Sequence, residues 1–149
     1  MPAYSSDSLS VFVDGPIDPA LPAACTDRFA ANRVIGAHVI FLGQVRADTI
    51  DGGTVAGIEY SAHESMARSA FNDIARRAAD ENEILDMVVR HSLGYVPAGQ
   101  VSLLIAVATA HRDAAYRASR FMLEAIKQDV PIYGREIGED DASRWKVNQ

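Results

Sequence analysis

The sequence predicts an α+β protein in which two long helices pack on a largely antiparallel sheet. Strand-like segments come in pairs, and two long amphipathic segments interrupt them. Their order along the chain is approximately β, β, β, α, β, β, α, β. Paired strands separated by helices favour a sheet with antiparallel neighbours, covered by the helices. A ferredoxin-like core with extra strands is the simplest topology that has this order of elements.

The first half of the chain is expected to be mostly strand. Residues 10–17 (SVFVDGPI) alternate between polar and apolar types before a Gly-Pro turn, which is typical of a strand. A connector rich in Pro and Ala follows, with a short helix expected near residues 26–31. Residues 33–46 and 55–63 are also strand-like. The polar, Gly-rich segment between them (ADTIDGGT) predicts a mobile loop.

The second half contains the two long helices. In residues 64–80, apolar side chains recur every three and four positions, which predicts an amphipathic helix. Residues 87–94 and 101–109 are strand-like, with a turn-bearing link (YVPAGQ) between them. The second of these strands is apolar on both faces and should be central. The clearest helix covers residues 113–128, and Pro131 ends it and begins a short strand, PIYGREI.

The composition sets the size of the fold and excludes several classes of partner. The 149 residues are expected to form one domain, with residues 1–9 and 139–149 flexible. The formal net charge of −6 argues against nucleic-acid and membrane surfaces as partners, because both require a basic face. No apolar run approaches the roughly eighteen residues of a membrane span, and the N-terminus has no features of a signal peptide.

The cysteine and histidine residues indicate neither a disulfide nor a metal site. Cys25 is the single cysteine, so no internal disulfide is possible, and a reducing, cytoplasmic location fits this composition best. His38 and His91 lie on strand patterns and are expected to be core or surface residues. No set of His, Cys and carboxylate residues has the spacing of a metal site, and no cofactor is expected.

Three basic features are candidates for chemistry. Arg46 ends a strand, His111 and Arg112 lie between a buried strand and a helix start, and Lys127 ends that helix with Arg135 beyond it. A helix N-terminus with an added His and Arg can bind a phosphate or carboxylate. Equally, Arg112 could pair with a surface acid while His111 fills the junction. From the pattern alone, Arg46 and Arg135 are better explained as exposed charges.

Lys127 allows two interpretations. A cation in the last turn of a helix is favoured by the helix dipole, and most such lysines do nothing else. However, Lys127 shares a stripe with Tyr116, Arg120 and Leu123, at spacings of four, three and four, along the border of the apolar face. A partly buried amine at this border would be a better nucleophile or acid–base group.

Several segments together resemble the large, catalytic subunit of molybdopterin synthase. They are GAHVIFLGQVR, IEYSAHESMA and the run HSLGYVPAGQVSLLIAVATAHRDAAYRASRFMLEAIKQDVPIYGRE. The resemblance extends from about Gly36 to Trp145, and its most specific part is the HR pair, the helix and the following K-x-x-x-P-[IF]-aromatic pattern. It implies a fold of the α/β-hammerhead type. It also implies a homodimer that binds a small ubiquitin-like subunit at each end, giving a heterotetramer.

The resemblance also implies a sulfurtransferase of molybdenum cofactor biosynthesis. The partner's C-terminal Gly-Gly tail, which carries a thiocarboxylate, inserts into a pocket, and sulfur passes to cyclic pyranopterin monophosphate to form the molybdopterin dithiolene. The family's essential lysine falls on Lys127, its anion-binding arginine on Arg46, and its His-Arg pair on His111 and Arg112. The cyclic phosphate requires Arg or protonated His donors. The lysine could donate protons or stabilise developing charge.

The chain departs from the family in its last predicted strand. The family usually has P-[IF]-W-K-[KR]-E, whereas Gly134 here replaces the second lysine and removes a cation from the site. Arg135 keeps a charge one residue further on and is a candidate substrate-binding residue, although strand alternation directs it to the other face. Lys146 or Arg144 could replace a further basic residue that the family often supplies downstream.

Three functions therefore remain open. A working synthase subunit with fewer basic residues is favoured, because Lys127, Arg46, His111 and Arg112 occur together. The alternative is a weak or inactive homologue that only binds the ubiquitin-like partner. The third is a small α+β domain that binds an anion.

The spacing of the candidates predicts a site shared between two chains. His111 and Lys127 bracket a helix of sixteen residues, so roughly 22–24 Å should separate them at 1.5 Å per residue. One chain cannot easily bring both to one small substrate. A two-fold dimer could combine His111 and Arg112 of one chain with Lys127 and Arg46 of the other.

Overall fold

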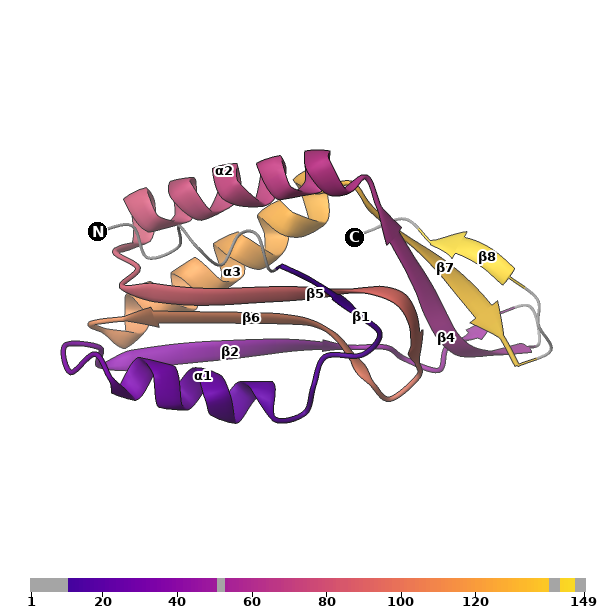
Figure 1. Cartoon of the computed structure of the whole chain (residues 1–149), viewed down its shortest axis with the longest axis horizontal. Coiled ribbons are helices and arrows are strands. Elements are labelled where there is room, and N and C mark those ends of the chain that lie inside the picture. Colours follow the sequence, from indigo (N-terminus) through magenta and orange to yellow (C-terminus); the bar gives the residue numbers. More distant parts are fainter. Residues whose placement is uncertain (1–10, 51–52, 140–142, 147–149) are drawn as a thin grey trace.

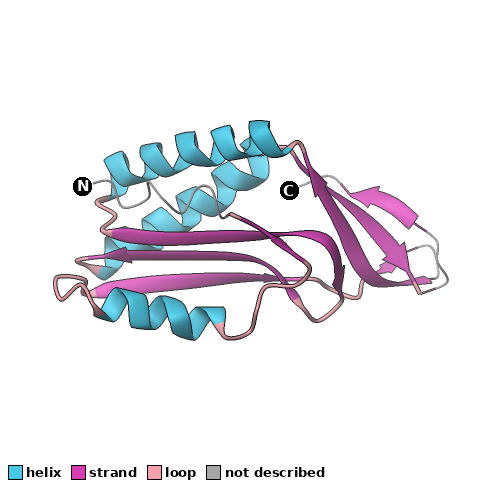
Figure 2. Ribbon diagram, in the orientation of Figure 1, coloured by secondary structure: helices cyan, strands magenta, loops and turns pink. Residues whose placement is uncertain are grey.

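A computed structural model describes residues 11–50, 53–139 and 143–146 as three helices and eight strands (Figures 1 and 2). The helices are α1 (Leu21–Ala30), α2 (Glu64–Asn82) and α3 (Arg112–Asp129). The strands are β1 (Phe12–Asp14), β2 (Ala37–Gln44), β3 (Thr49–Ile50), β4 (Gly53–Ala62), β5 (Asp86–Pro97), β6 (Val101–Thr109), β7 (Ile132–Gly138) and β8 (Ser143–Lys146).

The strands form one sheet with the order β2-β6-β5-β4-β7-β8, and all neighbours along this path are antiparallel. β1 pairs parallel with β5, and β3 pairs with β4. The unit from β4 through α2, β5, β6 and α3 to β7 has the βαββαβ element order. The predicted α+β class, with two long helices and a largely antiparallel sheet, is therefore confirmed.

The sheet bends at β5, whose two halves have different partners. Residues 86–91 pair with β6, whereas residues 94–97 pair with β4. Gly94 lies at this change with a φ of +81°, a backbone conformation that favours glycine. As a result, β4, β7 and β8 form a ribbon that leaves the direction of β2, β6 and β5 (Figure 1).

Helices cover both faces of the β2-β6-β5 part of the sheet. α2 and α3 lie on one face, where Phe71 and Met122 pack against Ile105 of β6, and α1 lies on the other face, where Phe29 packs against Leu104 (Figure 1). Residues of β6 alternate between these two clusters and are almost all buried. The prediction that this strand is central is confirmed.

Two predicted boundaries were wrong because proline was overweighted. α1 begins at Leu21 and not near residue 26, since Pro22 occupies the first turn, where its missing N–H costs nothing. β5 continues through residues 95–97, which were expected to be part of a turn. Only residues 98–100 connect it to β6.

Two segments predicted to be mobile contain strand. Within the Gly-rich segment, Thr49 and Ile50 form β3 and pair with the start of β4, while residues 51–52 lie outside the described residues. Within residues 139–149, which were expected to be flexible, residues 143–146 form β8 and pair with β7. Its polar composition does not reveal this, because the pairing uses main-chain groups on the open edge of β7. Residues 1–9 lie outside the described residues. Among the described helices, none is long and apolar enough to cross a membrane.

Candidate functional site

A cavity of about 430 Å³ opens where the β4-β7-β8 ribbon leaves the rest of the sheet. It draws residues from β2 and the segment after it, from β4, β5, β6 and β7, and from the last turn of α3. The lining residues are Phe41, Leu42, Gly43, Gln44, Val45, Arg46, Ile58, Tyr60, His91, Ser102, Leu103, Lys127, Ile132 and Gly134. The cavity therefore combines apolar walls with a few polar groups, which is typical of ligand sites.

Two of the predicted site residues, Lys127 and Arg46, line this cavity together. Lys127 is half-buried in the last turn of α3, where Pro131 and the extended Val130 stop the helix. Arg46 follows β2, and its side chain is 77% exposed, with Nε 3.3 Å from Oδ1 of Asp48. An ion pair this exposed is weak, so the guanidinium can exchange Asp48 for an anionic ligand at little cost.

The side of the cavity formed by β4, β5 and β6 carries neutral polar groups. Tyr60 Oη lies 3.1 Å from Ser102 Oγ, and the Tyr60 and His91 rings meet edge-on with centroids 5.1 Å apart. Burial lowers the pKa of His91 to about 4, against the effect of its hydrogen bond to Ser92, and the Lys127 charge lowers it further. Burial also raises the pKa of Tyr60, partly offset by Ser102. Both groups are therefore uncharged at neutral pH.

His111 and Arg112 lie at the opposite end of α3 from Lys127. His111 is the N-cap residue, makes no side-chain cap hydrogen bond, and is exposed, as is Arg112. Neither residue lines the cavity. The structure thus separates this pair from Lys127 and Arg46 within one chain, as the helix length predicted.

β7 places Gly134 and Arg135 on opposite faces. Gly134 lines the cavity, whereas Arg135 donates a hydrogen bond to Glu59 Oε1 at 2.8 Å and does not line it. A Cβ atom at position 134 would lie 3.1 Å from Cγ2 of Ile58, so the wall is tightly packed there. In the β7–β8 register, Lys146 lies opposite Gly134.

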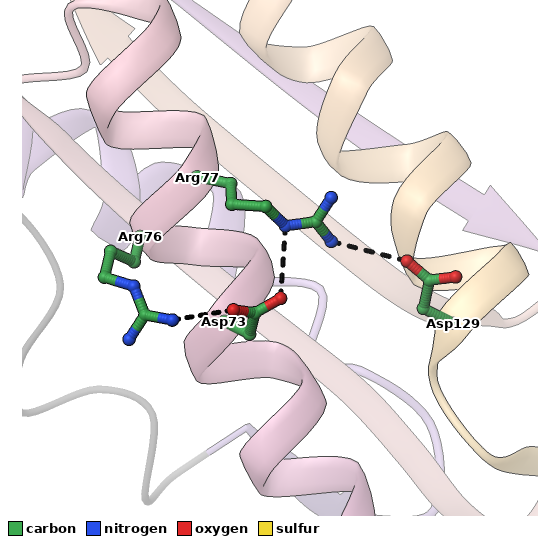
Figure 3. Close-up of polar contacts among 4 residues, drawn as sticks. All are labelled: Asp73, Arg76, Arg77 and Asp129. Carbon is green, nitrogen blue, oxygen red and sulfur yellow. Dashed lines mark hydrogen bonds and ion pairs between the residues drawn. The ribbon is translucent and has the colours of Figure 1, made fainter.

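The end of α3 that carries Lys127 is tied to α2 by a group of charged side chains (Figure 3). Asp129 accepts a hydrogen bond from the Arg77 guanidinium at 3.4 Å, and Asp73 accepts another from Arg77 Nε at 3.1 Å. Arg76 also donates to Asp73, at 2.7 Å. The Arg77 guanidinium lies 5.6 Å from the centre of the Phe121 ring. Arg77 thereby links α2 to the C-terminal end of α3.

Sequence reasoning missed the neutral polar groups of the cavity. His91 was expected to be a core or surface residue, and it is buried, but it also lines the cavity. Ser102 offered one signal, because it is polar within an otherwise apolar central strand. Tyr60 offered none, since an aromatic residue on a strand usually serves packing.

Comparison with known proteins identifies the family of this chain. The sequence profile of the family described as MoaE protein matches residues 16–129. The chain belongs to the MoaE protein family. The predicted resemblance is therefore confirmed. Within the part of the chain that the structure describes, no group of three or more potential metal ligands is found.

Curated relatives carry the name molybdopterin synthase catalytic subunit. One from Thermoplasma volcanium is 38% identical over 110 residues, which are 74% of this chain and 80% of that protein. One from Aspergillus niger is 37% identical over 114 residues, which are 76% of this chain and 63% of that protein. The match spans only about three fifths of the length of several fungal relatives of this MoaE-family chain.

Solved structures have the same fold. Molybdopterin synthase from Staphylococcus aureus superposes with a TM-score of 0.79 at 32% identity, over 91% of this chain and 94% of that one. A complex of subunits 1 and 2 of the molybdopterin-converting factor from Helicobacter pylori 26695 gives a TM-score of 0.77 at 22% identity, over 93% and 90% of the two chains. The second likeness concerns the fold alone.

Proposed function

We propose that this chain is the catalytic subunit of a molybdopterin synthase. It transfers sulfur from the C-terminal thiocarboxylate of a small ubiquitin-like subunit to cyclic pyranopterin monophosphate. The observation that carries the proposal is the convergence of Lys127 and Arg46 on one cavity from distant parts of the sequence. Family membership supports it, and so does the name of the relatives.

The cavity suits an inserted Gly-Gly tail. Phe41, Ile58 and Ile132 give it apolar walls that a chain without side chains can enter. Arg46 and Lys127 supply positive charge for the terminal thiocarboxylate and for the anionic substrate.

Lys127 is the catalytic residue of this proposal. Its amine lies at the cavity wall, where it can donate a proton to the reacting groups or stabilise charge that develops on them. Arg46 holds the anion in place. No cofactor bound by this chain is part of the proposal.

A second copy of the chain would complete the site. His111 and Arg112 are exposed at the far end of α3, so they are accessible to another molecule. In a two-fold homodimer within a heterotetramer, they would bind the cyclic phosphate beside the Lys127 and Arg46 of the other chain. Arg135 is paired with Glu59 away from the cavity and is left out of this arrangement. A cytoplasmic location and a single domain of 149 residues belong to the same proposal.

The alternative is a binding module that keeps the partner but has lost turnover, because Gly134 replaces a lysine in the cavity wall. Reconstitution tests the choice. The purified chain is mixed with a thiocarboxylated ubiquitin-like partner and cyclic pyranopterin monophosphate, and dithiolene formation is measured. Turnover supports the synthase. Tight partner binding without dithiolene favours the binding module, and the absence of partner binding rejects both.

A further inference from the structure

The hydroxyl groups of Tyr60 and Ser102 have one hydrogen to spare. Within the described residues, the contact between Tyr60 Oη and Ser102 Oγ at 3.1 Å is the one hydrogen bond that these two hydroxyls make. Two hydroxyls carry two hydrogens, and one hydrogen bond uses one of them. The pair therefore keeps a donor for a ligand in the cavity that both residues line.

His91 has a free acceptor on the same wall. Its Nδ1 lies 2.7 Å from the carbonyl oxygen of Ser92, which can only accept, so Nδ1 carries the hydrogen. In the neutral ring the lone pair then resides on Nε2. Among the described residues no group forms a hydrogen bond with Nε2. This atom is also not among the buried side-chain atoms that lack a partner, so it is accessible. It opens on the cavity that His91 lines.

The charges around this wall leave His91 neutral. Lys127 of α3 and Arg46 after β2 are the cations that line the cavity, and Tyr60 of β4 is its neighbouring titratable group. A positive charge on His91 is disfavoured by burial and by Lys127. The imidazole is therefore available as an acceptor throughout the neutral pH range.

We propose that Tyr60, Ser102 and His91 form a subsite for an amide group of the ligand. A hydroxyl of the Tyr60–Ser102 pair donates to the amide carbonyl, and Nε2 of His91 accepts from the amide N–H. One donor beside one acceptor matches an amide and leaves no buried polar group without a partner. Arg46 and Lys127, on the same cavity, bind the anionic end of the same ligand.

This inference rests on the proposed function, which offers two sources of an amide. One is the last peptide group of a Gly-Gly tail, next to its terminal carboxylate. The other is the lactam edge of a pterin ring. Both present a carbonyl oxygen and an N–H within one planar group, so the shared chemistry is that of an amide.

Equilibrium binding to the full chain tests the subsite without requiring turnover. The first probe is a peptide ending in Gly-Gly with a free carboxylate, compared with the same peptide ending in N-methylglycine, which lacks the N–H. The second probe is pterin-6-carboxylate. The double variant Tyr60→Phe/Ser102→Ala, which removes both hydroxyls, should weaken binding of the correct probe by about three- to tenfold, the effect of one hydrogen bond. Tyr133→Phe is the matched control, because Tyr133 is 51% exposed and does not line the cavity.

The N-methylated peptide separates the roles of the residues. If the tail occupies the subsite, N-methylation weakens binding to the wild-type chain but not to His91→Phe, whose acceptor is already gone. A loss for pterin-6-carboxylate alone assigns the subsite to the pterin ring. The subsite is overturned if the wild-type chain binds neither probe, or if Tyr60→Phe/Ser102→Ala behaves like Tyr133→Phe with both. Dithiolene formation in the reconstituted system remains the separate test of the function.

Discussion

The two ends of α3 differ in how much of their surroundings this chain supplies. At the C-terminal end, Lys127 lies half-buried at a cavity, beside a link between Asp129 and Arg77 of α2. At the N-terminal end, His111 and Arg112 are exposed, and neither lines the cavity that holds Lys127 and Arg46. The same helix thus has one end at a cavity and one end that is exposed.

This difference shows that a sequence resemblance can identify candidate residues without showing which of them meet within one chain. The residues at both ends match the same family pattern, yet only one end meets other functional groups within the chain. In the proposed synthase, the C-terminal end is the catalytic half and the N-terminal end contributes to a neighbouring site. The following experiments challenge that division, from the largest expected effect to the smallest.

Lys127→Ala should lower the rate of dithiolene formation by about a hundredfold to ten-thousandfold, the usual range for loss of a positioned acid–base group. The variant should still bind the partner, because only one side chain of the cavity is shortened. Single-turnover kinetics in the reconstituted system measure the effect. Arg120→Ala, an exposed change on the same helix, is the control. Equal losses in both variants would refute a special role for Lys127.

Mixing two inactive variants tests whether the ends of α3 meet across a dimer. A dimer of one Lys127→Ala chain and one His111→Ala chain keeps one intact site and loses the other. Random mixing should restore roughly a quarter of the wild-type activity, since half of the dimers are mixed and each has one working site. The assay is dithiolene formation after the variants are unfolded and refolded together. Activity that stays at the level of the separate variants would show that no site is shared.

Lowering the pH should destabilise the folded protein through protonation of His91. The ordinary pKa of 6.5 applies in the unfolded chain, and the folded value is about 4. Between these values the unfolded state binds a proton that the folded state does not. The contribution of His91 to the free energy of unfolding therefore falls as the pH decreases from 6.5 to 4, and it is constant below pH 4. The gap corresponds to roughly 3 kcal/mol. Urea unfolding at several pH values measures it.

The matched variants for this experiment are His91→Phe and His38→Phe. His38 is exposed and should keep the wild-type pH dependence. His91→Phe should flatten the decrease between pH 6.5 and 4, because the titrating group is removed. The same slope in all three proteins would contradict the proposed state of His91.

Gly134→Lys should raise the rate of dithiolene formation by about tenfold, the value of one charge-assisted hydrogen bond to an anionic ligand. The change places a second ammonium at the wall where the family usually has a lysine. Its Cβ would lie 3.1 Å from Ile58, so the wall must shift slightly. Gly134→Ala introduces the same Cβ without the charge. If both variants gain or lose activity equally, the missing cation is irrelevant and only the packing matters.

Arg77→Ala should reduce the free energy of unfolding by about 1 kcal/mol, since an exposed ion pair and a cation–π contact each contribute little. The difference should shrink at high salt, because screening weakens the contact with Asp129. Urea unfolding at low and high salt measures it. Arg76→Ala, which loses only a contact within α2, is the control. A loss larger in Arg76→Ala than in Arg77→Ala would show that the link between the helices contributes nothing.

The parts of the fold that were predictable are those governed by local periodicity. The apolar repeat of α3 gave its extent to within one residue at each end, and the two-sided apolar pattern of β6 identified the central strand. The edge strand was harder to predict, because β8 is held by main-chain pairing, which a polar sequence does not reveal. Pro22 led to a wrong start for α1, because proline is acceptable in the first turn of a helix.

The cavity was only half predictable. Lys127 and Arg46 carry charges in recognisable patterns, so the sequence singled them out. His91, Tyr60 and Ser102 lie on three strands whose neighbours are apolar, and their common position depends on the bend of β5 near Gly94. No local pattern encodes that bend, and therefore none encodes the neutral wall that it assembles.

The bend has a mechanical consequence. Ile58, Tyr60 and Gly134 lie on the ribbon, whereas Lys127 lies on α3 and His91 lies on the part of β5 that pairs with β6, so the cavity spans both sides of the bend. Tyr60 and Ile132 of the ribbon also pack into the core beneath α2 and α3, so a shift of the ribbon requires that core to repack. A molecule that binds along β7 therefore influences the shape of the cavity only through this shared packing.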